Sequence, residues 1–374
     1  MAHRALRDDL RTPKYQQVMQ SLSRDILSGK YPAGGKFPSE SQLVRQFRTS
    51  RITIGRALRE LAQKGMVERI AGSGTYVRDS AGGDGSRLFG LLIPDLGQTD
   101  IFEPICQGIA GAPEAAHQAL LWGHTVSEWG ASEEQALDLC EEYVRRKVSG
   151  VFFAPFERAA KAGQANQAIV ARLERARIPI VLLDRCVKPY PERSRHDLVG
   201  IDNRRAGYAA TQHLLQLGAP RVAFVAYAGS APTVDARIAG FQEASGDGAV
   251  HRLEGIDEGT IGPLIGRMRR GEGVVCANDR TAGRFMQTVM ALGSRIPQDI
   301  RIVGIDDVGY ASLLPVALTT IHQPCREIGE AAMAAMLSRV ERPNLLARDI
   351  LLEFRLVIRE SCGARLKPRA GRRH

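Results

Sequence analysis

Five polar residues in the C-terminal three quarters of the sequence are best suited to bind a small molecule: Asp184, Arg237, Asn278, Asp306 and Gln323. Asp184 and Asp306 come directly after short apolar runs, and Asn278 follows another run by one residue. If these runs are parallel strands, the polar residues lie at the strand ends where ligands bind in open sheets. Carboxylates, amides and a guanidinium can together hydrogen-bond adjacent hydroxyl groups. The set therefore predicts a cleft for a sugar or another polyol.

Other polar residues near these runs have a simpler explanation. Asp202-Asn203 and Asp279 each precede a helical segment, and both residue types often cap helix N-termini. We interpret them as caps rather than ligand contacts. His322 flanks Gln323 and is a weaker candidate for a ligand contact.

A basic helix face near the N-terminus has a second recognisable chemistry. The segment Arg51–Lys64 carries Ile54, Leu58 and Leu61 on one side at helical spacing. The opposite side presents the following residues: Arg51, Ile52, Gly55, Arg56 and Arg59. A helix with a basic edge of this kind fits the major groove of DNA. The sequence therefore predicts DNA binding.

Two further helices and a hairpin are predicted to position that helix. Tyr15–Ser28 has apolar residues at helical spacing, and Ser39 starts the next helix, with a glutamine three residues on to complete a capping box. Met66–Ile70 and Thr75–Val77 flank a glycine-rich turn and form a short hairpin. Together these elements predict a winged helix-turn-helix.

The distribution of charge supports this prediction. The formal net charge is +10, yet residues 1–80 alone hold 15 Lys and Arg against 7 Asp and Glu. The last twelve residues hold 5 basic residues and no acidic one. The basic excess is therefore at the two ends, as expected when a DNA-binding domain is fused to a nearly neutral one.

After residue 86 the sequence pattern changes to an alternation of strands and helices. Apolar runs that suit buried parallel strands are 88–94, 150–153, 180–183, 221–225, 273–276 and 300–305. Helical segments between them are 103–120, 132–146, 166–176, 204–217 and 280–292. This alternation predicts an α/β fold with doubly wound parallel sheets, divided into two lobes.

These features predict four segments along the chain. Residues 1–78 form the winged helix domain and 79–86, small and rich in glycine, a flexible linker. Residues 87–362 form the two-lobed ligand-binding domain, and 363–374 a basic disordered tail.

Several classes of protein are not favoured. The six cysteines include no C-x-x-C pair, so neither a zinc site nor a disulfide framework is indicated. There is no G-x-S-x-G elbow, phosphate-binding loop or His/Cys cluster, so we expect no catalytic residues, no cofactor and no metal. The polar N-terminus and the lack of a long apolar run predict a cytoplasmic protein without membrane contact.

The ligand-binding part resembles the effector domains of LacI-type repressors, whose fold is similar to periplasmic sugar-binding proteins. The matching segments are 199–225, 237–241, 275–279, 302–307, 318–323 and 356–361. The resemblance implies that Arg237, Asn278, Asp306 and Gln323 contact the effector, with Asp184 at the lobe boundary. It also suggests that Phe102 stacks on a sugar ring, although Phe102 could equally belong to the core.

The first eighty residues resemble the GntR family of regulators. The matching segments are 37–40, 50–54, 57–61, 64–65 and 72–75. The resemblance places Arg51 as the arginine that reads the groove and Gly72–Gly74 at the wing tip. The residues predicted to face DNA are Ser39, Glu40, Ser50, Arg51, Ile52, Thr53, Arg56, Gly72, Ser73 and Gly74. The combination of the two domains is similar to the arabinose repressors of some bacteria.

Some positions depart from these families. Ser41 and Gly55 stand where arginines are usual, so we expect a different operator. Ala154 stands where a polar contact might be expected in the cleft, and nothing resembles the hinge helix of LacI-type repressors.

The sequence as a whole predicts a regulator, most often a repressor in such families, that binds double-stranded operator DNA as a homodimer. A small polar effector, with a sugar favoured, would control the affinity for DNA. Two alternatives stay open: a solute-binding protein without a regulatory role, and a regulator that responds to a non-sugar effector.

Overall fold

The computed structural model describes residues 14–27, 30–32, 34–63, 66–70, 73–77, 87–93, 100–123, 126–127, 130–131, 133–157 and 162–365. The chain divides into two compact units, Met1–Ser86 and Arg87–His374. No helix of the described residues is both long and apolar enough to cross a membrane.

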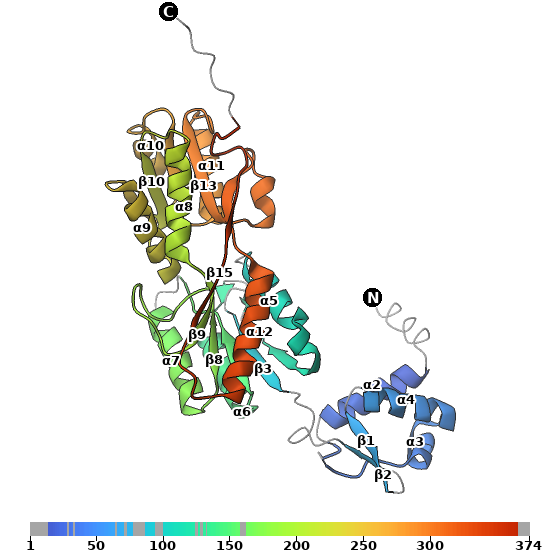
Figure 1. The fold of residues 1–374 in the computed structure, drawn as a ribbon. Coiled ribbons are helices and arrows are strands. Elements are labelled where there is room, and N and C mark those ends of the chain that lie inside the picture. The colour runs from blue at the N-terminus through green and yellow to red at the C-terminus, as the bar shows by residue number, and fades with distance from the viewer. Residues whose placement is uncertain are drawn as a thin grey trace, which may run out of the picture. The chain divides into compact units, whose positions relative to one another are not determined.

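The described part of the first unit comprises three helices and a hairpin (Figure 1). Its elements are α2 (Lys14–Leu27), α3 (Glu40–Phe47), α4 (Arg51–Gln63), β1 (Val67–Ile70) and β2 (Gly74–Val77). The predicted capping box is present: the Ser39 hydroxyl accepts from the Gln42 amide, and the Gln42 side chain accepts from the Ser39 amide. Leu22, Leu43 and Leu61 are fully buried in the core between the helices.

The hairpin is tied to the chain that precedes α3. β1 and β2 are antiparallel, with Val67 opposite Val77. The Phe37 amide donates to the Thr75 carbonyl at 2.7 Å, and the Val77 amide donates to the Gly35 carbonyl at 2.9 Å. These bonds fix the wing relative to the start of α3.

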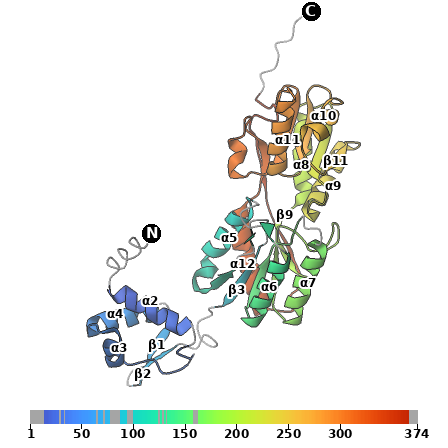
Figure 2. The ribbon, with the colours of Figure 1, turned by 180° about the vertical axis from the view of Figure 1, so that it is seen from behind.

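The second unit contains two six-stranded sheets, one in each of two lobes (Figures 1 and 2). The first lobe's sheet has the order β15-β9-β8-β7-β3-β4. Its strands are β3 (Leu88–Leu92), β4 (Ala119–Trp122), β7 (Gly150–Phe153), β8 (Ile180–Leu183), β9 (Asp197–Ile201) and β15 (Asp349–Leu352). All its neighbouring strands are parallel. A two-stranded hairpin, β5 (Val126–Ser127) and β6 (Gly130–Ala131), follows β4.

The second lobe's sheet has the order β11-β10-β12-β13-β14-β16, and only its last pair, β14 with β16, is antiparallel. Its strands are β10 (Val222–Tyr227), β11 (Val250–Leu253), β12 (Glu272–Cys276), β13 (Ile300–Asp306), β14 (Thr319–His322) and β16 (Arg355–Val357). Within 162–365 the chain crosses between the lobes three times, after β9, after β14 and after β15. The predicted doubly wound α/β fold in two lobes is confirmed.

Helices cover both faces of each sheet. In the first lobe α6 (Glu133–Arg145) and α7 (Ala162–Arg175) lie on one face, while α5 (Phe102–Gly111) and α12 (Cys325–Glu341) lie on the other (Figure 2). In the second lobe α8 (Asn203–Gln216) pairs with α9 (Pro232–Ser245), and α10 (Glu258–Ile265) with α11 (Asp279–Ala291). Short 3₁₀ helices occur at Pro113–His117 and Gly309–Ser312.

The predicted helix 103–120 is too long. The helix α5 ends at Gly111, and Ala112 is extended (ψ 137°). Pro113 explains the break, because a proline disfavours helical backbone in the residue before it. Leu120 belongs instead to strand β4.

Two helix pairs pack through reciprocal glycines. A Cβ atom at Gly240 of α9 would lie 1.8 Å from the Arg204 carbonyl oxygen, and one at Gly207 of α8 would lie 2.0 Å from that of Arg237. Gly108 of α5 and Gly329 of α12 make the same kind of close approach. Because the backbone of α9 carries Arg237, this contact also fixes a predicted ligand-binding residue.

Gly240→Ala is expected to destabilise the second unit, because the added methyl group meets backbone that cannot rotate away. An overpacked core site of this kind typically costs about 1–3 kcal/mol. Thermal unfolding followed by circular dichroism measures the effect. Gly163→Ala in α7 is the matched control, since a Cβ there meets nothing within 4 Å. Equal melting temperatures for the two variants would contradict the packing argument.

Candidate ligand cavity and nucleic-acid interface

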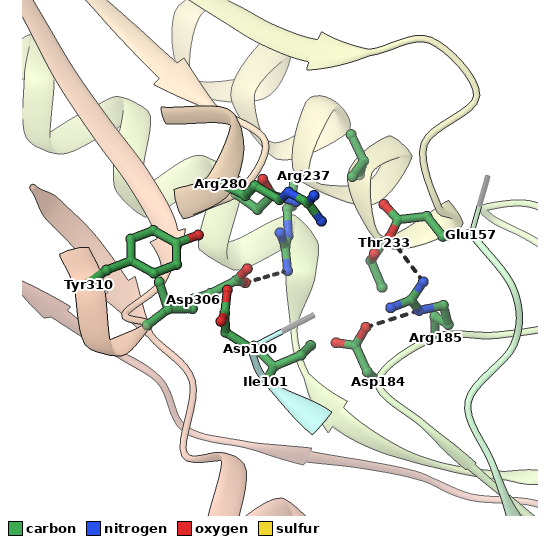
Figure 3. A pocket seen from close by; sticks show the side chains of 13 residues that line it. Asp100, Ile101, Glu157, Asp184, Arg185, Thr233, Arg237, Arg280, Asp306 and Tyr310 are labelled. Atoms are coloured by element: carbon green, nitrogen blue, oxygen red, sulfur yellow. Dashed lines mark hydrogen bonds and ion pairs between the residues drawn. The ribbon is translucent and has the colours of Figure 1, made fainter. Parts of the chain in front are cut away.

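A cavity lies where the two lobes of the second unit face each other (Figure 3). The empty space in it is about 510 Å³, counted together with the open solvent at its mouth. Its polar lining is as follows: Asp100, Glu157, Asp184 and Arg185 from the first lobe, and Thr233, Arg237, Asn278, Arg280, Asp306 and Tyr310 from the second. The structure therefore brings four of the six predicted effector residues to one cavity.

Asp306 and Arg237 form the second lobe's side of this cavity. Arg237 is buried and donates from Nε to the Asn203 side chain at 2.8 Å and from Nη1 to the Ala277 carbonyl at 2.6 Å. Its Nη2 lies 3.5 Å from Oδ1 of Asp306. Gln323 donates to the same Oδ1 at 2.7 Å. Gln323 does not line this cavity; it lines a neighbouring one together with Asp306, and its hydrogen bond orients that carboxylate.

The electrostatic state of Asp306 is unusual. Burial raises the pKa of Asp306 well above its ordinary range, and the Arg237 guanidinium opposes that shift. Burial likewise raises the pKa of Asp279 to about 6, while the hydroxyl of Thr320 and the amide of Val308 donate to its carboxylate and oppose the rise. The negative charge of Asp279 raises the pKa of Asp306 further, because like charges disfavour ionisation. Donors from a bound molecule would favour the charged form of Asp306.

Asp184 forms the first lobe's side of the cavity. Its Oδ2 accepts from Nε of Arg185 at 3.3 Å, and Nη1 of Arg185 lies 3.2 Å from Glu157. The other carboxylate oxygen, Oδ1, is buried and has no hydrogen-bond partner among the residues that the structure describes. A buried acceptor without a partner costs free energy, so this atom requires a donor from elsewhere. The carboxyl groups of Asp100, Asp184 and Asp306 point toward the same space (Figure 3).

The backbone is strained at both of these carboxylates. Asp184 has φ 65° and Asp306 has φ 133°, values that residues with a side chain rarely adopt. Such conformations persist where the surrounding structure imposes them, and they cluster at ligand sites.

Asn278 lines the cavity and also caps α11, because its Oδ1 accepts from the Thr281 amide at 2.8 Å. Phe102 does not line the cavity. It lies in the core, 2% exposed, with the Arg185 guanidinium 5.1 Å above its ring. The structure thus places Phe102 in the core position that the sequence left open, where it supports Arg185.

The interpretation of the other strand-end residues as caps is right for Asp202 and wrong for Asn203 and Asp279. Asp202 caps α8 as expected, by accepting from the Arg205 amide at 2.9 Å. Asn203 is not a cap: it is the first residue of α8 and holds Arg237. Asp279 is not a cap either, because Asn278 caps α11 and Asp279 is buried in the second lobe. Ala154 is buried as well, and His322 bonds to Asp307 at 2.9 Å.

Sequence reasoning missed several cavity residues, among them Asp100, Glu157, Arg185 and Tyr310. Arg185 directly follows Asp184, a predicted effector residue, so its position in the sequence could have indicated it. Nothing in the sequence pattern distinguishes Tyr310, whose hydroxyl has a raised pKa because of burial and because of Asp100.

The predicted DNA-facing residues of the first unit differ in the exposure of their side chains and in their contacts with neighbouring side chains. Arg51 is 73% exposed, although Nη2 lies 3.2 Å from the Ser41 hydroxyl and Nε 4.0 Å from Glu40. Ile52 is 82% exposed. Arg56, in contrast, stacks on the Tyr15 ring at 3.8 Å and lies 3.7 Å from Glu60. Arg56 is therefore the predicted contact most involved in holding α4 to α2.

The remaining residues of this set shape the backbone. The Ser50 hydroxyl accepts from the Thr53 amide at 3.2 Å and bonds to its hydroxyl, which caps α4. Ser39 caps α3. At the wing, Ser73 bonds to the Tyr76 hydroxyl at 2.7 Å, and Gly74 has φ 131°. Gly72 lies outside the described residues.

Comparison with known proteins agrees with both halves of the structure. A model of bacterial regulatory proteins of the gntR family matches residues 14–77, and one of periplasmic binding protein-like domains matches 211–362. The chain is 29% identical over 366 residues to the arabinose metabolism transcriptional repressor of Geobacillus stearothermophilus, covering 93% of this chain and 97% of the relative. It is 27% identical to the repressor of the same name from Halalkalibacterium halodurans, with 93% and 96% covered.

Solved structures share the fold of the second unit. A LacI family transcriptional regulator from Enterococcus faecium with bound ribose has a TM-score of 0.59 and 24% identity, covering 74% of this chain and 98% of the other. The complex of the regulator CelR with cellobiose has a TM-score of 0.60 and 20% identity, and the match covers 90% of this chain and 94% of the other. The predicted combination of a GntR-type helix-turn-helix with a periplasmic-binding-protein-like domain is confirmed.

Proposed function

We propose that this homologue of arabinose repressors and LacI-family regulators is a transcriptional repressor that binds operator DNA as a homodimer. A sugar bound in the cavity between the two lobes controls its affinity for DNA. The observation that carries the proposal is the cavity itself. The Asp184 oxygen that has no partner within the described part of the chain and the Arg237–Asp306 pair face each other across it, in a chain that also has a gntR-type regulatory domain.

A neutral polyol matches this lining better than an apolar molecule does. Asp184 and Asp306 accept hydrogen bonds, while Arg237 and Asn278 provide donors, so adjacent hydroxyl groups can be bound on both sides. The named relatives repress arabinose metabolism, and the solved neighbours hold ribose and cellobiose. A sugar is therefore the favoured effector. Because operator DNA is the partner, we expect the protein to act in the cytoplasm.

The ligand controls DNA binding if it favours one arrangement of the lobes. Asp184 and Asp306 belong to different lobes, so a molecule bonded to both draws the lobes together. A ligand shifts such an equilibrium by the difference between its affinities for the two states. The arrangement of the two DNA-binding domains in the dimer changes with it.

A dimer is proposed because helix-turn-helix proteins bind palindromic half-sites with two recognition helices. Sedimentation velocity measures the oligomeric state. A monomer at the concentration that saturates the operator would remove the dimer from the proposal.

The test of the proposed function combines DNA selection with a sugar panel. Duplexes are selected from a random library, and the affinity of the protein for the best one is measured by fluorescence anisotropy with and without each sugar. We expect one sugar to raise both the Kd for DNA and the melting temperature of the protein. Failure to select any duplex over random competitor would overturn the regulator. A specific duplex whose binding no sugar changes would overturn the sugar effector.

Arg51→Ala is expected to weaken binding to the selected duplex by about 1–3 kcal/mol, the usual value of an arginine that reads a guanine. Binding to random duplex should fall much less. Arg45→Ala is the matched control, because Arg45 is an exposed arginine of α3 that bonds to the Ser41 carbonyl. Equal losses for both variants on both duplexes would mean that Arg51 contributes charge only.

A further inference from the structure

Ile52 is an exposed apolar residue in the first turn of α4. Its 82% exposure contrasts with Ile54 and Leu58 on the opposite face, which are fully buried. Single exposed apolar residues are common on protein surfaces, so exposure alone assigns no role. Its position does, because the N-terminal residues of a recognition helix are those that reach base edges in the major groove.

The neighbours of Ile52 leave its side chain accessible. Gly55 lies one turn along the helix, on the same face as Ile52. A Cβ atom at Gly55 would meet nothing within 4 Å, so that part of the surface is open. Arg51, next to Ile52, is directed toward Ser41 and Glu40. Arg56 is stacked on Tyr15. Since Ile52 is 82% exposed, none of the described side chains of this face covers it.

The major groove offers one apolar feature to such a side chain. Guanine, cytosine and adenine present hydrogen-bond donors and acceptors there, whereas thymine also presents a methyl group. An aliphatic side chain cannot bond to the polar edges, and it gains free energy by burying the methyl group.

We propose that Ile52 determines specificity for a T·A base pair, by contacting the thymine methyl group beside the base that Arg51 reads. The missing side chain at Gly55 permits this approach. The inference rests on the proposed function, since it concerns the operator half-site of a DNA-binding regulator.

The test is a double-mutant cycle between the protein and the DNA. In the selected duplex each thymine of one half-site is replaced in turn by deoxyuridine, which lacks only the methyl group. For the wild type we expect one position at which this replacement weakens binding about fourfold, the effect of losing one buried methyl group. For Ile52→Ala the same replacement should have no effect. Gln46→Ala, at an exposed position of α3 outside the predicted DNA-facing set, is the control variant, and it should keep the wild-type pattern.

The outcomes separate the inference from the proposed function. A selected duplex for which no deoxyuridine replacement weakens binding overturns the role of Ile52 and leaves the regulator intact. A replacement that weakens the wild type and Ile52→Ala equally also overturns it, because another residue then contacts the methyl group. If no duplex can be selected at all, the proposed function fails and the inference fails with it.

Discussion

Asp197→Ala is expected to lower the free energy of unfolding of the second unit by about 3–5 kcal/mol, the usual cost of removing one partner from a buried ion pair. Asp197 is fully buried at the start of β9. Its carboxylate accepts from Nε and Nη2 of Arg339 at 3.1 and 2.9 Å. It also accepts from the backbone amide of Arg348 at 2.8 Å and from that residue's guanidinium. The carboxylate thus joins β9 to the end of α12 and to the residue before β15.

Differential scanning calorimetry measures this loss, which corresponds to a fall in melting temperature on the order of 10 °C. Asp349→Ala is the matched control, since Asp349 pairs with Arg193 at 2.9 Å and both side chains are partly exposed, at 36% and 45%. An exposed pair contributes only about 0–1 kcal/mol. Similar melting temperatures for the two variants would show that Asp197 does not hold these elements together.

The same carboxylate predicts a pH dependence. The hydrogen bonds from Arg348 and Arg339 lower the pKa of Asp197 despite its burial. Its contribution to stability is therefore complete above the unfolded pKa, which is about 3.9, and is lost as the pH falls through the lower folded value. We expect the difference in free energy of unfolding between wild type and Asp197→Ala to become smaller below about pH 4. A difference that stays constant down to pH 2 would contradict a lowered pKa for Asp197.

The sequence predicted elements whose pattern is local and strong. The strands 150–153 and 180–183 coincide with β7 and β8, because continuous apolar runs suit strands buried on both faces. The capping box was predictable because its two partners, Ser39 and Gln42, are only three residues apart. Local chemistry was sufficient at each of these positions.

The sequence did not predict α9 or α12. Gly240 and Gly329 lie within these helices and are poor helix formers in isolation. Both are required by a neighbouring helix that is distant in sequence, through contacts with Arg204 and Ile105. Asp197 was missed for a related reason, because its partners Arg339 and Arg348 lie about 150 residues away. Long-range packing of this kind leaves no periodic signal.

The candidate site was predicted in part. Asp184, Arg237, Asn278 and Asp306 line the cavity because the carboxyl ends of parallel strands and the adjacent helix starts face the gap between the lobes. The sequence could not show that Gln323 bonds to Asp306 without lining this cavity, or that Arg185 links Asp184 to Glu157. Which polar residue faces a ligand and which supports a neighbour depends on side-chain direction. The strand pattern does not specify that direction.

Asp306→Asn is expected to weaken effector binding by about 10- to 100-fold while the affinity for the operator without effector stays within about twofold. Oδ1 of the asparagine still accepts from Gln323 and Arg237, so the support of the side chain is retained. The second oxygen becomes an N–H donor and the negative charge is lost. A hydrogen bond to a charged group is worth about 1.5–3 kcal/mol, which gives this range.

Isothermal titration calorimetry with the effector sugar, together with anisotropy on the selected duplex, measures both quantities. Asp307→Asn is the control, because Asp307 is the next residue but bonds to His322 and Arg359 and does not line this cavity. That variant should keep the wild-type response to the sugar. If Asp306→Asn binds the sugar as tightly as the wild type, the acceptor facing the cavity is not used. The ligand would then be held by Asp184 and the first lobe, and closure of the two lobes around it would lose its physical basis.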